Sequence, residues 1–207
     1  MHTQGSDIET NKAQTFTVLF EVGTSALAFI EEEGGDFLPP SLLESFFEHG
    51  SSDATFGRRG QLFYAEFDRN APSFSEAVLT AIADLEAASS HVLVVRVEPE
   101  ELVNAASIAE RTGRTREGVR LHIAGLRGPG KFPEPRFYLD SAHPIWTWSA
   151  VAAWYAQYTG EESDEASDAA FLAALNAALE IRRYAPSALG VKERDAIADL
   201  VMTGLHK

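Results

Sequence analysis

The 207-residue sequence contains no cysteine, and this absence excludes several kinds of site. Without thiols the chain can form no disulfide, no thiolate metal site, no iron–sulfur cluster and no cysteine nucleophile. Long apolar runs are also missing, whereas a membrane-spanning helix needs about 20 such residues. The N-terminal segment MHTQGSDIETNKAQ lacks the apolar stretch of a secretory signal. We therefore expect a soluble cytoplasmic protein with no membrane partner.

Signatures of catalysis and of cofactor binding are equally scarce. The six histidines lie far apart in the sequence, and none forms H-E-x-x-H or another spacing typical of metal ligands. The glycine-rich segment 125–130 (GLRGPG) lacks the G-K-[ST] ending of a phosphate-binding loop, and its proline removes an amide donor. No G-x-S-x-G sequence marks a serine nucleophile. The sequence predicts no enzyme, no cofactor and no metal.

Positive charge is scarce overall but concentrated in one window. The chain has 17 Lys and Arg against 31 Asp and Glu, which gives a formal net charge of −14. Seven of those basic residues lie between 111 and 136, where Glu117 and Glu134 are the only acids, so this window carries +5 and the rest −19. A basic patch in an acidic chain favours a phosphate-binding surface. From charge alone, the alternative is a solvated surface that happens to be basic.

The first half of the chain predicts a mixed α+β layer. Residues 1–14 are polar and predict a disordered tail. Residues 15–98 have the order β-α-β-β-α-β, and their short connections and apolar helix faces predict a ferredoxin-like sandwich. The stretch 23–36 fits either a short strand with an acidic turn or a short helix. The expected strands are 15–22, 53–56, 61–68 and 91–97. The expected helices begin at Pro40 and after Ser73. The expected core includes Phe63, Phe67, Val78, Ile82 and Val94.

Residues 99–158 predict two short helices, a glycine-rich loop and a third helix. Gly113 allows a tight turn between the first two helices, and Val119 packs the second helix against the first. The expected helices are 104–111, 116–124 with Thr115 as its N-cap, and a third one capped by Ser149, with extended pieces near 132–139 and 144–148. This order is the plan of a winged helix-turn-helix domain.

The outward face of the second helix carries the side chains expected to bind DNA. Because Val119 faces inward, the opposite face projects into a major groove. Arginines there can reach phosphates or base edges, and basic residues of the loop can lie over the adjacent backbone. The helix is short of the Asn and Gln side chains that discriminate bases. The candidate DNA-binding residues are Arg114, Thr115, Arg116, Glu117 and Arg120 around the second helix, and Arg127 and Lys131 on the loop.

Several short motifs occur together between residues 102 and 156. An I-A-x-x-x-G helix precedes a T-R-x-x-V helix, an F-P-x-P loop and a tryptophan-bearing strand that leads into V-x-x-W. The residues concerned are Ile108, Ala109, Gly113, Thr115, Arg116, Val119, Phe132, Pro133, Pro135, Trp146, Val151 and Trp154. With these residues the segment resembles the MerR/excisionase (AlpA-like) winged helix-turn-helix regulators, which implies DNA binding. His122 departs from the pattern, since the family usually has a buried leucine there.

A wider resemblance covers residues 50–156. The segments 52–57 (SDATFG) and 67–69 (FDR) are similar to segments that precede this domain in a bacterial group of helix-turn-helix proteins. This resemblance also implies DNA binding, but it implies no particular operator.

Two groups of apolar residues in the C-terminal half allow more than one interpretation. The aromatic residues Trp146, Trp148, Trp154 and Tyr155 could stack on single-stranded bases, but their place in a winged domain favours the core. The extension 159–207 contains an acidic linker at 161–168 and two helical patterns, near 169–183 and 192–204. The first pattern carries Phe171, Leu172, Leu175 and Leu179, which we expect to dock on the body or on a second subunit.

The sequence predicts a sequence-directed regulator that binds double-stranded DNA as a homodimer. The ferredoxin-like domain, 15–98, would mediate dimerisation or sensing, and the winged domain, 99–158, would bind DNA. Two alternatives stay open. One is an excisionase-like factor that bends DNA, and the other is a protein–protein adaptor that uses a degenerate winged helix.

Overall fold

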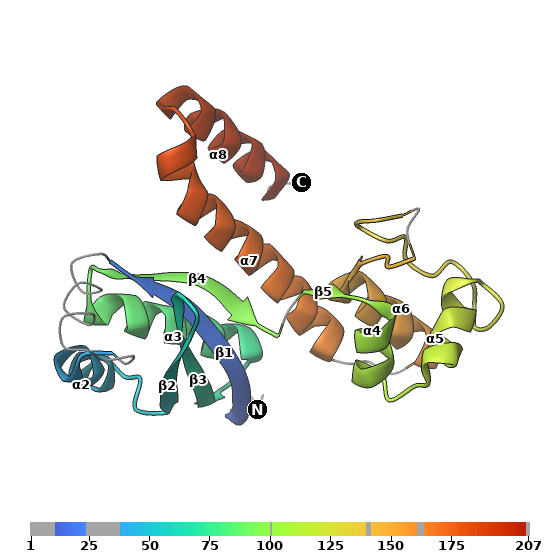
Figure 1. Ribbon diagram of the computed structural model, residues 1–207, viewed down its shortest axis with the longest axis horizontal. Coiled ribbons are helices and arrows are strands. Elements are labelled where there is room, and N and C mark those ends of the chain that lie inside the picture. The colour runs from blue at the N-terminus through green and yellow to red at the C-terminus, as the bar shows by residue number, and fades with distance from the viewer. Residues whose placement is uncertain (1–10, 24–37, 100, 140–141, 161–163, 206–207) are drawn as a thin grey trace, which may run out of the picture.

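The computed structural model describes residues 11–23, 38–99, 101–139, 142–160 and 164–205. It is a mixed α+β structure with two packed regions, which we call the sheet lobe (residues 11–99) and the helical lobe (residues 101–160). The long helix α7 (Asp164–Ala188) runs from one lobe to the other (Figure 1). Most of the undecided stretch, 24–36, lies outside the described residues.

The sheet lobe is built on a four-stranded antiparallel sheet. The strand order is β2-β3-β1-β4, so the first strand lies inside the sheet between the third and the fourth. The strands are β1 (Lys12–Val22), β2 (Ala54–Arg59), β3 (Leu62–Ala71) and β4 (Val92–Glu98).

Two boundaries in this sheet correct the sequence-based expectations. The predicted disordered tail, residues 1–14, extends too far along the chain, because Lys12 already pairs with Ala71 in the β1–β3 ladder. The turn between β2 and β3 is also shorter than the turn over residues 57–60 that the sequence predicts. Arg59 pairs with Leu62, which leaves Gly60 and Gln61 as the two turn residues, and Gly60 has a φ of 62°. Glycine adopts such positive φ values without steric cost.

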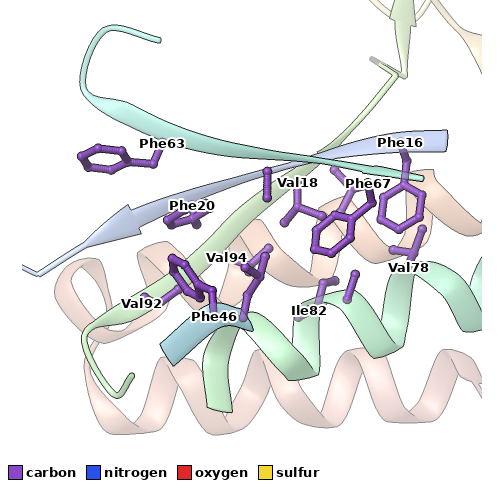
Figure 2. Packing of buried hydrophobic residues seen from close by; sticks show 14 of the residues in the cluster. Phe16, Val18, Phe20, Phe46, Phe63, Phe67, Val78, Ile82, Val92 and Val94 are labelled. Atoms are coloured by element: carbon purple, nitrogen blue, oxygen red, sulfur yellow. The ribbon is translucent and has the colours of Figure 1, made fainter. Parts of the chain in front are cut away.

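One face of the sheet packs on two helices, α2 (Pro40–Glu48) and α3 (Phe74–Ala88). In Figure 2, Phe16, Val18 and Phe67 point toward α3, whereas Phe20 lies toward Phe46 of α2. Ser73 accepts a hydrogen bond from the Glu76 amide and so caps α3, as the capping-box pattern predicts. The five predicted core residues Phe63, Phe67, Val78, Ile82 and Val94 are all buried. Each such side chain contributes about 1.5–3 kcal/mol by leaving water.

The SDATFG and FDR segments meet through a buried arginine. Arg69 donates to both carboxylate oxygens of Asp53, at 2.9 and 3.0 Å, and to Asp84 at 2.8 Å. It also donates to the carbonyl oxygen of Gly50 and to the hydroxyl of Thr80. Burial lowers the pKa of Arg69, but the hydrogen bonds and charges of the two carboxylates outweigh burial and raise it. Through Arg69, these two segments connect the loop after α2 with β3 and α3. Their role here is therefore structural.

The first C-terminal helix begins earlier than the sequence predicts, and the second begins about where it is predicted. Helix α7 starts at Asp164, inside the stretch predicted as a linker, and α8 (Val191–Leu205) folds back at its far end (Figure 1). As expected, the apolar stripe of α7 docks on the body: Leu172 and Leu179 are buried in the core of the sheet lobe. Ala169 of the same helix belongs to the core of the helical lobe. The stripe thus contributes to both cores.

Helix α7 also covers the β4 edge of the sheet. The amide of Asn176 bonds both backbone groups of Val97, accepting from its N–H and donating to its carbonyl, each at 2.9 Å. At Val94 the carboxylate of Glu86 accepts from the N–H, and Arg182 donates to the carbonyl. Unpaired edge groups of a strand invite pairing with another chain. These side chains provide hydrogen-bond partners within the molecule for backbone groups of the β4 edge.

The helical lobe contains three helices and a small two-stranded sheet. The helices are α4 (Ala105–Arg111), α5 (Arg116–Ile123) and α6 (Trp148–Thr159), and β5 (Leu102–Val103) pairs with β6 (Trp146–Thr147). The strand at 102–103 was not predicted. The prediction that Ser149 caps the third helix is wrong, because α6 begins at Trp148 with Thr147 as its N-cap, and the carboxylate of Glu101 accepts from the Ser149 amide and hydroxyl.

Within the described part of the chain, no helix combines the length and the apolar character needed to cross a bilayer.

Replacing Asn176 tests the contact between α7 and β4. Asn176→Ala leaves the buried N–H and carbonyl of Val97 without their partner, and we expect the free energy of unfolding to fall by about 1–3 kcal/mol. Denaturant unfolding measures this loss. Glu180→Ala, at an exposed position of the same helix, is the control. Equal stability of the two variants would show that the amide contributes nothing to the edge.

Candidate nucleic-acid interface

Helices α4 and α5 are joined by a tight turn whose geometry follows from its sequence. The side chain of Asn104 caps α4 by accepting from the amides of Ala106 and Ser107. At the other end, the Arg114 amide donates to the Ala109 carbonyl at 2.9 Å, and Gly113 has a φ of 62°. This is the Schellman arrangement, in which a left-handed glycine ends a helix. It fixes the direction in which the chain enters α5.

Both ends of α5 are also defined. Thr115 caps the helix by accepting from the Gly118 amide at 3.0 Å. After the last turn, Leu126 donates to the Leu121 carbonyl while Gly125 has a φ of 66°, which is a second Schellman arrangement. One face of α5 is buried through Val119 and His122, and the opposite face is exposed. The expected N-cap and the expected burial of Val119 are confirmed.

The outward face of α5 carries Arg116, Glu117 and Arg120, all of them exposed. Arg120 donates two hydrogen bonds to the Glu117 carboxylate, at 2.7 and 2.8 Å. The hydrogen bond from Arg120 lowers the pKa of Glu117, and the same bond raises the pKa of Arg120. Because these groups are three positions apart on a helix, the sequence spacing could have revealed the pair.

Arg114 lies apart from this face. Its guanidinium stands over the rings of Tyr155 and Tyr158, 5.0 and 5.6 Å from their centroids, and its Nε atom is buried. A cation over aromatic faces is favourable. The side chain therefore packs the turn between α4 and α5 against α6 instead of pointing outward with Arg116. The sequence pattern grouped Arg114 with the outward residues, and no spacing rule distinguishes the two roles.

The loop that carries Arg127 and Lys131 is held to the helical lobe by tryptophans. The indole N–H of Trp154 donates to the Gly130 carbonyl, and that of Trp146 donates to the Pro133 carbonyl, each at 2.9 Å. Lys131 lies between these two anchors, and both basic side chains are exposed. The buried tryptophans belong to the core, as favoured above, so they offer no surface on which bases could stack.

His122 occupies the centre of an aromatic cluster. It is fully buried, its Nδ1 lies 2.9 Å from the Tyr155 hydroxyl, and Trp154 and Tyr158 complete the cluster. Burial lowers the pKa of His122, and the positive charges of Arg114 and Arg127 lower it further. The imidazole is therefore neutral near pH 7. It fills the position where the resembling regulators usually have leucine.

No family model, curated protein or solved structure matches the chain. In the part of the chain that the structure describes, no group of three or more His, Asp or Glu side chains is placed to hold a metal ion.

Acidification is expected to destabilise the helical lobe through His122. The folded-state pKa lies below the unfolded value of about 6.5, so the unfolded chain binds the proton more readily. The neutral imidazole makes its full contribution to the free energy of unfolding above about pH 6.5, and this contribution is lost as the pH falls. We expect His122→Leu/Tyr155→Phe to flatten the fall in unfolding free energy between about pH 7.5 and 5.5.

The control variant is His91→Gln, which removes an exposed imidazole outside the helical lobe. Denaturant unfolding at several pH values measures both variants. A slope against pH that is equal in the wild type and the double variant would contradict the role of His122.

Proposed function

We propose that the protein binds double-stranded DNA in a sequence-directed manner and acts as a transcriptional regulator. The observation that carries this proposal is the outward face of α5. Arg116 and Arg120 project from a helix whose ends are capped and whose inner face is locked by Val119. A rigid helix with arginines on its outward face can enter a major groove and donate to phosphates and base edges.

The order of elements supports a winged helix-turn-helix assignment for the helical lobe. The strand β5 precedes two short helices that are joined by a tight turn, and a long loop, the paired strand β6 and a third helix follow. In this assignment α5 is the recognition helix, and the loop with Arg127 and Lys131 lies over the neighbouring phosphates. Thr115 then acts as a cap at the DNA-facing end, and Arg114 supports the turn from within.

The strand order of the sheet lobe supports a ferredoxin-like assignment. The order β2-β3-β1-β4, with α2 after β1 and α3 after β3, is that of two interleaved βαβ units. We assign this lobe to dimerisation or sensing. A homodimer follows from the small size of the helical lobe, since a single module of this kind buries little surface on DNA.

The charge distribution supports orientation of the encounter with DNA. The window 111–136 carries +5 and the remainder −19, so phosphates are attracted to one side of the molecule and repelled elsewhere. This separation favours productive collisions more than it strengthens the final complex.

A specific observation favours the adaptor alternative. Helix α8 exposes apolar side chains, with Val191, Leu200 and Met202 all more than half exposed. Such a surface suits a protein partner or a second copy of the chain. The DNA-binding experiment separates the two functions, because an adaptor with a degenerate winged helix would leave DNA unbound.

Arginine substitutions on α5 and on the loop should have different effects on DNA binding. Arg116→Ala or Arg120→Ala should weaken binding to selected genomic fragments about 5- to 150-fold and reduce discrimination, if the side chain contacts a guanine. Arg127→Ala or Lys131→Ala should weaken binding to all sequences and reduce the salt slope by roughly one. Gel shifts at several salt concentrations measure these effects.

The matched control is Arg194→Ala, which removes an exposed arginine of α8. It should bind like the wild type. The proposal is wrong if the Arg116→Ala/Arg120→Ala double variant binds as well as the wild type at ordinary salt. It is also wrong if the wild type binds no DNA at low salt, and the adaptor function then takes its place.

Neutralising Glu117 should strengthen DNA binding. In the free protein Glu117 holds Arg120 and places a negative charge on the DNA-facing side. Glu117→Gln releases the guanidinium and removes repulsion of phosphates, so we expect affinity to rise by about two- to fivefold at low salt. Fluorescence anisotropy measures the change, and Glu180→Gln on α7 is the control. Weaker binding of Glu117→Gln would show that Glu117 itself accepts from a base or positions Arg120 for DNA.

A further inference from the structure

A cleft lies where the two lobes meet the first turns of α7, and we call it the junction cleft. Its volume is about 480 Å³. The sheet lobe lines it from β1 and the start of α3, and the helical lobe lines it from the end of α4 and the start of α6. Clefts of about 300–1,000 Å³ between packed regions are common binding places for small molecules. None of the candidate DNA-binding residues lines the junction cleft.

The wall of the junction cleft is apolar and held in place by its neighbours. Trp148 and Leu172 line the cleft and are buried. Phe74 also lines it and packs edge-on against Phe16 and Phe171, with ring centroids 5.8 and 6.4 Å apart. Side chains that are already fixed lose little freedom when a ligand arrives. The apolar part of a ligand would therefore meet a preformed surface.

The charged side chains of the junction cleft are mostly acidic. Four acids and two bases line it, which gives the lining a formal charge of −2. They are Glu101, Asp164, Glu165, Asp168, Lys12 and Arg111. Glu101 accepts from the Ser149 hydroxyl, and the guanidinium of Arg111 stands 5.0 Å from the centroid of the Trp148 ring. The other three acids belong to the first turns of α7, so negative charge is concentrated on that side of the cleft.

Asp168 is the carboxylate in this group for which a bound cation would matter most. It is half-buried, and none of the described residues donates a hydrogen bond to it. Burial raises the pKa of Asp168, and the charges of Asp164 and Glu165 raise it further, while Lys12 lowers it. Acids in the first turn of a helix interact favourably with the helix dipole, but Asp168 lies in the second turn, where this effect has decayed. A cation in the cleft would offset the repulsion among the three carboxylates.

We propose that the junction cleft binds a small organic cation, in which a primary amine or guanidine group is attached to an apolar body. The cationic group donates to Asp168 and Asp164, and the apolar body lies on Trp148 and Leu172. A metal ion fits the cleft less well, because within the described part of the chain no three acidic side chains are placed to hold one. The ligand touches both lobes and α7, and its binding does not depend on the proposed DNA-binding function.

Isothermal titration calorimetry of the full-length protein with tryptamine and phenethylamine tests the proposal, since both probes join an ammonium group to an aromatic body. We expect at least one of them to bind with a Kd below about 1 mM. Indole-3-propionate, which carries a carboxylate in place of the amine, is the ligand control and should not bind. Asp168→Asn should weaken amine binding about 10- to 100-fold, because a charge-assisted hydrogen bond is lost. Asp164→Asn, at an exposed position, should also weaken it.

The matched control variant is Asp199→Asn, which removes an exposed acid of α8 and should bind the amine like the wild type. Denaturant unfolding without ligand separates a lost ligand contact from a lost structural contact. Asp168→Asn removes repulsion from the folded state, so it should be at least as stable as the wild type near pH 7.

Several results would overturn the proposal. Failure of both amines to bind would do so, as would equal binding of an amine and indole-3-propionate. Equal affinity of Asp168→Asn and the wild type would place the amine elsewhere, and equal weakening by Asp199→Asn would show only general attraction to an acidic chain. Clearly lower stability of Asp168→Asn would show that this carboxylate already has a structural partner, which also contradicts the proposal.

Discussion

The burial of one face of α5 against α6 is the constraint on which the proposed interface depends. Val119 and His122 are both fully buried there, and the rings of Trp154 and Tyr155 surround the imidazole. Because an α-helix has one rigid set of side-chain directions, this burial determines that Arg116 and Arg120 face outward. The same aromatic cluster anchors the basic loop through the Trp154 indole. Helix α5 and the basic loop are therefore positioned by one packed core.

Helix α7 links that core to the sheet lobe. It contributes Ala169 to the helical core and Leu172 and Leu179 to the sheet core, and Asn176 closes part of the β4 edge. A rigid helix packed on both sides transmits a displacement of one lobe to the other better than a flexible linker.

Much of the sheet lobe could be predicted from the sequence, because alternation, capping and turn residues agree there. Phe63, Phe67 and Val78 follow the periods of strand and helix, and Ser73 caps α3 as its motif predicts. The turn before α5 was equally predictable from Gly113 and Thr115. Local patterns of this kind are specified by neighbouring residues, so one sequence suffices to recognise them.

Features that depend on distant contacts could not be predicted. Arg114 looks like its neighbour Arg116 in the sequence, yet two tyrosines of α6 draw it inward. The early start of α7 reflects its packing on both lobes, and the cap that Glu101 supplies to α6 comes from 48 residues away. The helix and strand propensities of neighbouring residues do not indicate these distant contacts. The same holds for Asn176, whose partner is the backbone of β4.

Recognition of particular DNA sequences is the function on which the proposed roles of α5 and the basic loop depend. The most direct test is selection of genomic fragments by the full-length protein, followed by sequencing of the bound pool. If the chain recognises particular sequences, we expect enrichment of fragments that share a short common sequence, at a salt concentration where unselected DNA is released. A bound pool with the same sequence composition as the input would contradict it.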